Sequence, residues 1–272
     1  MSRFSKEEVN NIIKLYKEGM SQKEIANLYS TYNTSIRRIL IRNNVKIRGE
    51  AASQAYVKKN PFKRNDEKSD YFLGLLLTDG CISNNKISLS LKEDDVYILE
   101  EFAKFCSPKL QVTKYYHSVH NKFQYSVHFK DSRRIVIGYL EKLGRFTNKS
   151  YECKLYKPVN YNILRGIIDG DGSIYSTNRG KSFRVSICSK SKDFINQIAY
   201  FYQKEGYGYF INQRKDGLYY IHVDSKEDLL RLGYNLYHDA HIFLKRKYER
   251  WSHFAEMQRQ NNTLNSGNEM AI

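Results

Sequence analysis

Two stretches of the chain change from a helical to an alternating pattern of apolar positions at an Asp-Gly pair. Residues 71–83 read YFLGLLLTDGCIS, and residues 163–175 read ILRGIIDGDGSIY. Each begins with an apolar run that contains one glycine, and each run ends at an aspartate followed by glycine. The first is followed by KISLSLK, in which apolar and polar residues alternate as in a half-buried strand. The pattern predicts a buried helix that ends at the acid and leads into a β-hairpin.

The predicted elements follow the same order after both stretches. After the first come a helix over DDVYILEEFAKF, an alternating strand FQYSVHFK and a helix over SRRIVIGYLEKLG. After the second come the strand SFRVSICSK, the helix KDFINQIAYFY, a hairpin at Asp216-Gly217 and the helix KEDLLRLGYNL. We interpret both halves as helix, two strands, helix, two strands, helix, and Asp79 and Asp171 lie 92 positions apart. The sequence therefore predicts an α+β fold that contains a tandem duplication.

The N-terminal segment has helical periodicity only. Apolar residues from Val9 to Tyr16 recur at helical spacing, and Gly19 is expected to end this first helix. Ser21 and Glu24 form an S-x-x-E capping box that predicts the start of a second helix. We expect that helix to turn three residues inward: Ile25, Leu28 and Tyr29.

A third short helix is predicted from about Thr34 to Arg42. It would bury Ile36, Ile39 and Leu40 and expose three arginines, Arg37, Arg38 and Arg42. Three such helices with a basic outer face resemble a helix-turn-helix DNA-binding domain. The alternative is a small helical bundle whose basic face is incidental.

These patterns divide the chain into five predicted parts. They are a helix-turn-helix domain (1–48), a basic linker (49–68), a first repeat (69–156), a second repeat (157–254) and a flexible polar tail (255–272).

Charge and cysteine content narrow the class of protein. The net charge is +16, and residues 1–68 hold 15 Lys/Arg against 7 Asp/Glu, so half of the excess lies in the first quarter of the chain. A surplus of this size attracts polyanions, and nucleic acid is the first partner to consider. The four cysteines show no C-x-x-C spacing, which argues against a disulfide framework or a zinc site. Apolar runs stop short of the roughly 18 residues of a membrane span and no signal segment is evident, so we expect an intracellular, cytoplasmic protein.

An aspartate at the C-terminal end of a helix needs an explanation. The helix dipole places partial negative charge there, which disfavours a carboxylate by about 0.3–1 kcal/mol. An Asp-Gly turn that simply ends the helix would explain one such aspartate. The duplication of the signal at Asp79 and Asp171 favours a functional reading.

The two motifs resemble those of the LAGLIDADG homing endonucleases. The matching nonapeptides are FLGLLLTDG, Phe72 to Gly80, and LRGIIDGDG, Leu164 to Gly172. The first departs from the family pattern, with Leu77 and Thr78 where Asp and Ala are usual. Both keep the acid at the eighth position. The segment LGRFTNKSYECKLYKP resembles the stretch between repeats in monomeric members, and FLKRKYERW occupies the equivalent place in the second half.

The resemblance implies a site-specific endonuclease for double-stranded DNA, encoded by an intron, a phage or another mobile element. Asp79 and Asp171 would be catalytic and would hold two or three divalent cations, and oxygen ligands of this kind suit Mg²⁺. Two carboxylates crowded at two negative helix ends repel each other, and a cation removes that penalty. Lys149 and Lys247, or Arg246 in place of the latter, would neutralise developing phosphate charge. The mid-helix glycines, Gly74 and Gly166, would let the two helices pack closely.

In this family the strands form a DNA-binding saddle, and the protein would be a monomer. The arginines of the third helix would anchor flanking DNA. Candidate contacts on the polar strand faces are Lys86, Ser88, Ser90, Lys92, Gln124, Ser126, His128, Lys130, Arg184, Ser186, Lys190, Gln213, Arg214, Tyr220 and His222.

Two alternative functions fit the same scaffold. A non-cleaving transcriptional regulator would typically have lost the acidic pair. An RNA maturase that assists splicing of a host intron would use the same basic charge, with the 23 tyrosines available for stacking on bases. An intein is disfavoured because no initial Cys or Ser begins a splicing block and the end NEMAI lacks His-Asn.

Overall fold

A computed structural model describes residues 4–18, 20–47, 57, 59–83, 85–117, 122–131, 133–177 and 182–269. Contacts divide the chain into two compact units, residues 1–58 with 86–132 and residues 59–85 with 133–272, each described by itself. Asn84 and most of the predicted linker lie outside the described residues. Among the described residues, no helix combines the length and apolar character needed to cross a membrane.

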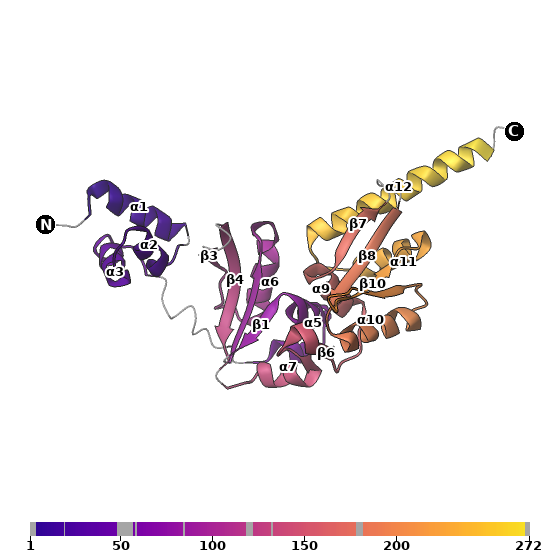
Figure 1. Cartoon of the computed structure of the whole chain (residues 1–272), viewed down its shortest axis with the longest axis horizontal. Coiled ribbons are helices and arrows are strands. Elements are labelled where there is room, and N and C mark those ends of the chain that lie inside the picture. Colours follow the sequence, from indigo (N-terminus) through magenta and orange to yellow (C-terminus); the bar gives the residue numbers. More distant parts are fainter. Residues whose placement is uncertain are drawn as a thin grey trace. The chain divides into compact units, whose positions relative to one another are not determined.

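Three short helices, drawn in indigo in Figure 1, form the N-terminal part of the first unit. They are α1 (Lys6–Lys17), α2 (Gln22–Leu28) and α3 (Asn33–Arg42). Their common core consists of Ile12, Tyr16, Ile25, Ala26, Ile36 and Leu40. Capping boxes begin the first two helices, at Ser5 with Glu8 and, as predicted, at Ser21 with Glu24.

One inward position of α2 was predicted wrongly. Leu28 is 62% exposed, whereas Ile25 and Ala26 are buried. The helix has only seven residues, so two adjacent positions already supply its contact with α1 and α3. Leu28 is its last residue and points away from that contact.

The first unit also contains a sheet and one long helix. Strands β2 (Lys86–Leu91), β4 (Lys122–Lys130) and β3 (Thr113–His117) pair antiparallel in that order. A 3-10 turn, η2 (Glu93–Asp95), leads into α6 (Val96–Cys106), which packs on β2 and β4. The alternation predicted for KISLSLK is confirmed, because Ile87 and Leu89 are buried between Lys86, Ser88 and Ser90, which are not.

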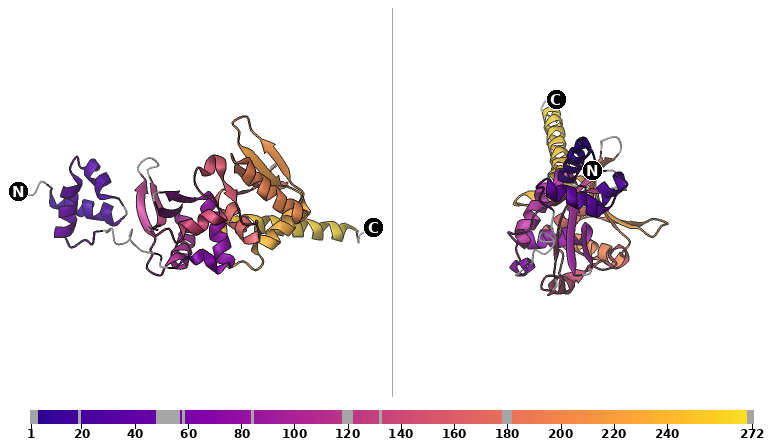
Figure 2. Two further views of the ribbon diagram at one scale, coloured as in Figure 1. Left: turned by 90° about the horizontal axis from the view of Figure 1, so that it is seen from below. Right: turned by 90° about the vertical axis from the view of Figure 1, so that its left-hand side faces the viewer.

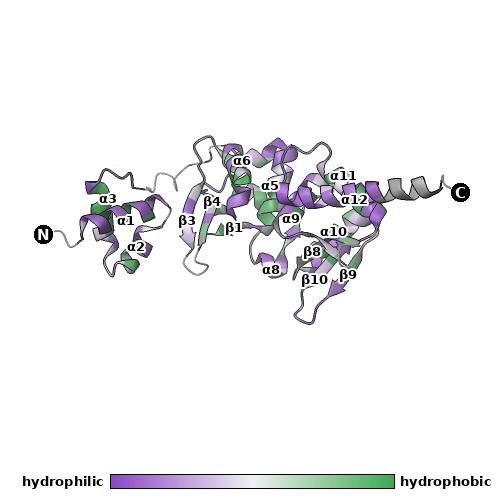
Figure 3. Cartoon of the chain, turned by 90° about the horizontal axis from the view of Figure 1, so that it is seen from above, coloured by the Kyte–Doolittle hydropathy of each residue, from purple (hydrophilic) through white to green (hydrophobic). Residues whose placement is uncertain are grey.

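The second unit is built around two helices, α5 (Glu67–Thr78) and α9 (Tyr161–Gly170), which make the most extensive helix contact in the structure. A short 3-10 turn, η1 (Pro61–Arg64), precedes α5 within the segment predicted as linker. Asp66 caps α5 and Asn160 caps α9 through side-chain oxygens. Residues 69–77 of α5 are buried, and from Tyr71 onward they form the apolar run of the sequence (Figure 3).

Shorter elements connect the two helices in sequence. Strand β1 (Gly80–Ser83) follows α5, and α7 (Ile137–Leu143), β5 (Gly144–Arg145), α8 (Lys149–Glu152) and β6 (Lys154–Leu155) precede α9. The two short strands, β5 and β6, pair antiparallel.

A four-stranded sheet follows α9. Its strands are β7 (Ser173–Thr177), β8 (Ser182–Ser189), β10 (Tyr219–Val223) and β9 (Phe210–Gln213), in that spatial order. Helices α10 (Lys192–Lys204) and α11 (Lys226–Tyr237) pack against it. The chain thus runs through helix, two strands, helix, two strands and helix twice, and the predicted α+β class is confirmed. The five predicted domain boundaries remain predictions.

The last helix, α12 (Lys245–Glu269), differs from the expectation for the C-terminal tail. It is the yellow helix of Figure 2, and it continues past Ala255, where the sequence predicted a flexible segment. Phe254 and Ala255 are buried, and the Phe254 ring packs on Phe183 of β8 at 4.7 Å between centroids. This contact anchors the first half of the helix, and the five residues that follow Ala255, EMQRQ, have high helix propensity.

Candidate active site

Asp79 and Asp171 each end one of the two central helices. Asp79 is the C-cap of α5, and its backbone N–H donates to Leu75 O at 2.9 Å. Asp171 is the C-cap of α9, and its N–H donates to Ile167 O at 3.1 Å. Both acids therefore occupy the negative end of a helix dipole, as the sequence predicted.

Glycines bring the two helices into direct backbone contact. A Cβ added at Gly74 would lie 2.2 Å from Ile163 O, and one added at Gly166 would lie 2.1 Å from Tyr71 O. No side chain fits at either distance, so the separation of α5 and α9 is set by main-chain atoms. This is the packing role expected of both glycines.

The contact continues to the helix ends. A Cβ at Gly170 would lie 1.9 Å from Thr78 Oγ1 and 3.4 Å from Asp79 Oδ2. The residue before Asp171 thus touches the last residue of α5 and faces the carboxylate of Asp79. The two acids leave their helices at the same end of the pair.

The pKa values of the two carboxyl groups are raised in this buried position. Burial, and then the negative charge of Asp171, raise the pKa of Asp79 to about 6. Burial also raises the pKa of Asp171, while the ammonium groups of Lys149 and Lys247 oppose that rise. Both acids are more easily protonated than a solvated aspartate.

Two lysines occupy equivalent places at the two helix ends. Lys149 Nζ donates to Thr78 O at 2.8 Å, to Leu76 O at 3.2 Å and to Gly80 O. Lys247 Nζ donates to Ile168 O at 2.5 Å and to Gly172 O. The carbonyls of Leu76 and Gly80 correspond to those of Ile168 and Gly172 across the 92-residue repeat.

These contacts explain how each helix tolerates an acid at its end. An ammonium placed on the last carbonyls of a helix offsets the dipole and satisfies acceptors that have no partner within the helix. Burial lowers the pKa of both lysines, that of Lys247 to about 8. The sequence suggested the two lysines only through the family resemblance, and it gave no sign that they cap the helices.

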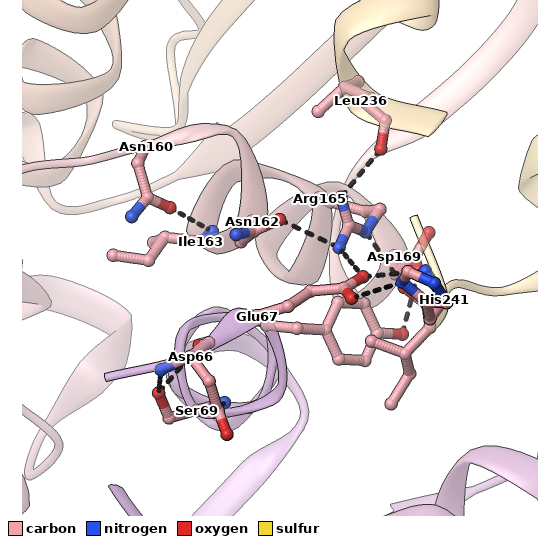
Figure 4. Close-up of polar contacts among 12 residues, drawn as sticks. Asp66, Glu67, Ser69, Asn160, Asn162, Ile163, Arg165, Asp169, Leu236 and His241 are labelled. Carbon is pink, nitrogen blue, oxygen red and sulfur yellow. Dashed lines mark hydrogen bonds and ion pairs between the residues drawn. The ribbon is translucent and has the colours of Figure 1, made fainter. Parts of the chain in front are cut away.

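A buried polar cluster links α5, α9 and the segment between α11 and α12 (Figure 4). Arg165 of α9 is 2% exposed and donates to Glu67 of α5 at 2.6 Å and to Leu236 O at 2.7 Å. Asp169 is fully buried, accepts from Tyr71 OH at 2.8 Å, and has a pKa raised by burial to about 7. Asp169 stands at the sixth position of the second nonapeptide, but the sequence did not indicate its partners, because they are far apart along the chain.

The metal-binding capacity of the site rests on the two acids. Among the described residues, no group of three or more His, Cys, Asp or Glu side chains forms a metal cluster. A cation held by Asp79 and Asp171 would therefore take its other ligands from water and substrate. That composition fits Mg²⁺, which commonly binds one or two carboxylates together with waters and substrate phosphates.

The strand register in the first unit places the predicted DNA contacts on one face. Lys86 pairs with Lys130, Ser88 with His128 and Ser90 with Ser126. Gln124 lies on this face as well and accepts a hydrogen bond from Tyr115 OH at 2.6 Å. Ser126 is buried and the rest are at least partly accessible; Lys92 follows the end of β2 and is exposed.

The predicted contacts of the second sheet are less uniform. Tyr220 and His222 pair with Cys188 and Ser186, so they share a face with Arg184. Lys190 lies just past the end of β8 and is exposed.

Gln213 pairs with Tyr219 and so lies on the opposite face from Tyr220. The next residue, Arg214, is exposed and donates to Tyr220 OH at 3.0 Å. Ser186 and His222 are buried, and Arg184 binds Asp224 at 2.8 Å. In the N-terminal helices, the three predicted anchors are all exposed on α3: Arg37, Arg38 and Arg42.

Two packed helices, α5 and α9, each end in an acid and are each followed by a strand. Residues 159–235 match the family of LAGLIDADG-like domains, which confirms the predicted family resemblance; the match contains the second nonapeptide, and the first lies outside it. No curated protein matches the chain.

Solved structures share this fold at low sequence identity. A point mutant of I-SmaMI has a TM-score of 0.53 and 14% identity, covering 78% of this chain and 96% of that one. The LAGLIDADG homing endonuclease I-LtrWI bound to target DNA has a TM-score of 0.52 and 14% identity, covering 71% and 91%. I-SmaMI bound to uncleaved DNA with calcium ions has a TM-score of 0.50 and 14% identity, covering 75% and 93%.

Proposed function

We propose that the protein is a site-specific endonuclease that hydrolyses one phosphodiester bond on each strand of a DNA duplex. The observation that supports this proposal is that Asp79 and Asp171 each end one of two helices in backbone contact, and that a lysine caps each of those helix ends. Retention of both acids favours cleavage over the non-cleaving regulator.

The two carboxylates are proposed to hold Mg²⁺. Burial raises the pKa of both acids, and the charge of Asp171 adds to the rise at Asp79, so a divalent cation between them would stabilise the two charged carboxylates. When bound, Mg²⁺ supplies a Lewis acid that polarises water and neutralises phosphate charge. Solved relatives support a nucleic acid and ion site of this kind, because I-SmaMI was solved with DNA in the presence of calcium ions.

Lys149 and Lys247 are proposed to act in two ways. Each caps a helix and so fixes the position of the acid at its end. Each also places a positive charge beside the carboxylates, where charge on the cleaved phosphate would develop. Their lowered pKa values keep a proton more available than on a solvated lysine.

The basic charge and the polar strand faces are proposed to bind the duplex. The shared face that runs from Lys86 to Lys130 and the face that contains Tyr220 would contact base edges and phosphates. The exposed arginines of α3 would hold flanking DNA. We further propose that the protein acts as a monomer inside the cell that hosts its mobile element.

Cleavage of a randomised duplex library in the presence of Mg²⁺ tests this function. The wild-type protein should cut a restricted set of sequences, whereas Asp79→Asn and Asp171→Asn should bind the selected duplex without cutting it. Asp239→Asn is the matched control, because the Asp239 side chain is 92% exposed and lies outside the site. Full activity in either site variant would refute the assignment, and stimulation of intron splicing without DNA cleavage would favour the maturase alternative.

A further inference from the structure

Asp169 is a buried carboxylate that connects three separate segments. It is fully buried on α9, and its Oδ2 accepts hydrogen bonds from Tyr71 OH at 2.8 Å and from the backbone N–H of Leu244 at 2.7 Å. Tyr71 belongs to α5, and Leu244 immediately precedes α12. One side chain therefore ties both central helices to the start of the last helix.

The anchor leads directly to Lys247. Leu244 O accepts from the backbone N–H of Lys247 at 2.9 Å and from that of Tyr248 at 3.1 Å, so Leu244 begins the first turn of α12. Lys247 Nζ then returns to α9 through Ile168 O at 2.5 Å. Asp169, Leu244 and Lys247 thus close a ring of contacts on the C-terminal end of α9.

The described residues of the first repeat show no equivalent anchor. The position that matches Asp169 across the 92-residue repeat is Leu77, which is buried and apolar. Lys149 is carried instead by α8, a helix of four residues that follows Asn148 at φ 49° with no side-chain cap among the described residues. The two capping lysines bind equivalent carbonyls, but Lys149 lies on the short helix α8 and Lys247 lies on α12, whose start is bonded to Asp169.

A leucine would be the less costly residue at position 169. Asp169 Oδ1 is buried without a hydrogen-bond partner among the described residues. Burying a carboxylate is unfavourable unless it is paired and hydrogen-bonded. The positive charges of Lys247 and Arg165 offset part of this cost. Leu77 shows that the first repeat folds with an apolar residue at the matching position.

We propose that Asp169 is a positioning residue that holds Lys247 in place through the start of α12, so that the two half-sites are supported by different means. The catalytic part of this proposal rests on the proposed nuclease function. Its consequence is that loss of the Asp169 carboxylate slows cleavage of one DNA strand and leaves the other strand almost unaffected.

Strand-resolved kinetics test the proposal. The selected target duplex carries a different label on each strand, and single-turnover rates are measured for Asp169→Leu, which introduces the residue of the first repeat, and for Asp169→Asn, which keeps one acceptor oxygen. Since a displacement of about 1 Å can cost roughly 100-fold, we expect Asp169→Leu to slow one strand by about 10- to 100-fold, so that nicked duplex accumulates. Asp169→Asn should slow the same strand by a smaller factor. If the leucine variant does not fold, the asparagine variant alone decides.

Tyr71→Phe is the control for general damage to the cluster. It removes one hydrogen bond to Asp169 but leaves the bond from Leu244, which is the bond proposed to position Lys247. Any loss of activity should therefore be the same for both strands. A merely structural role for Asp169 would slow both strands equally in the leucine and asparagine variants, and that result would overturn the proposal.

Chemical labelling gives a readout that does not depend on nuclease activity. Lys247 is 4% exposed, so its amine should resist acylation in the wild-type protein, as read by mass spectrometry. Asp169→Leu should increase the labelling of Lys247 several-fold without changing that of Lys149. Unchanged labelling of Lys247 would overturn the positioning role. If the wild-type protein cuts no duplex, the nuclease proposal fails while this measurement still decides the role of Asp169.

Discussion

Gly74 and Gly166 face each other's helix across a contact in which the nearest partner of each is a main-chain carbonyl. The two closest approaches, 2.2 Å to Ile163 O and 2.1 Å to Tyr71 O from an added Cβ, are almost equal. The two glycines thus make equivalent contacts. Main-chain atoms of α5 and α9 touch directly and fix the spacing of the helices that end in Asp79 and Asp171.

Replacement of Gly74 by alanine should destabilise the protein. The new methyl group overlaps backbone atoms that cannot rotate away, and overpacking of this kind costs about 1–3 kcal/mol. Urea unfolding of the second unit measures the change. Gly138→Ala is the matched control: nothing lies within 4 Å of its added Cβ, and the better helix propensity should stabilise by up to about 1 kcal/mol. Equal stability of the Gly74 variant and wild type would contradict backbone contact.

The raised pKa of Asp79 predicts a pH-dependent difference between wild type and Asp79→Asn. Because the folded-state pKa of about 6 exceeds the usual value of 3.8, the folded protein retains the proton longer than the unfolded chain. The contribution of Asp79 to stability is therefore present below pH 4 and is lost as the pH rises through 6. In EDTA, Asp79→Asn should be more stable than wild type at pH 7.5, and the advantage should disappear near pH 4.

Denaturant unfolding at a series of pH values measures this difference. Added Mg²⁺ should raise the stability of wild type at pH 7.5 and raise that of the variant less, since a cation binds the intact carboxylate pair. A variant that is less stable than wild type at pH 7.5 in EDTA would contradict the crowding of the two acids.

Lys149→Met should lower stability by about 1–3 kcal/mol, because the variant leaves carbonyls of α5 without their charged donor. The unbranched methionine keeps most of the apolar stem. Lys204→Met, at an exposed position of α10, is the control and should stay within about 0.5 kcal/mol of wild type. Cleavage measured well below the melting temperature then separates the capping role of Lys149 from its proposed role beside the cleaved phosphate. Activity that survives in the folded variant would restrict Lys149 to capping.

The exposed arginines of α3 provide a test of the N-terminal helices as a DNA anchor. Simultaneous replacement of Arg37, Arg38 and Arg42 by alanine leaves the buried core of the three helices unchanged. If each arginine contacts a phosphate, DNA affinity should fall and the slope of log K against log salt should decrease by about 3. Lys14→Ala with Lys17→Ala, on α1, controls for charge alone. Unchanged affinity and salt dependence would exclude the anchor.

The duplicated motif could be predicted from sequence because its constraints are local. A helix that contacts another through its backbone requires glycine, and Gly74 and Gly166 stand at matching positions five residues before Asp79 and Asp171. The alternation of β2 was equally clear, because Ile87 and Leu89 are buried between more exposed residues.

What the sequence did not reveal depends on contacts between distant segments. Asp169 meets Tyr71 and Leu244, which are 98 and 75 residues away, so no spacing rule could pair them. Lys149 and Lys247 reach helix-end carbonyls only because of the paths of α8 and α12. The misplacement of Leu28 has a different cause: in a helix of seven residues, periodicity does not define the inward face well.

The backbone contact at the two glycines also bears on how such a protein can change its target. Side chains on the strand faces can be replaced without altering the separation of α5 and α9, because no side chain sets that separation. Under the proposed function, the offset between the two cuts would stay constant while the recognised bases vary. Evolution or engineering of new targets would thus alter which duplex is chosen and leave the length of the single-stranded ends unchanged.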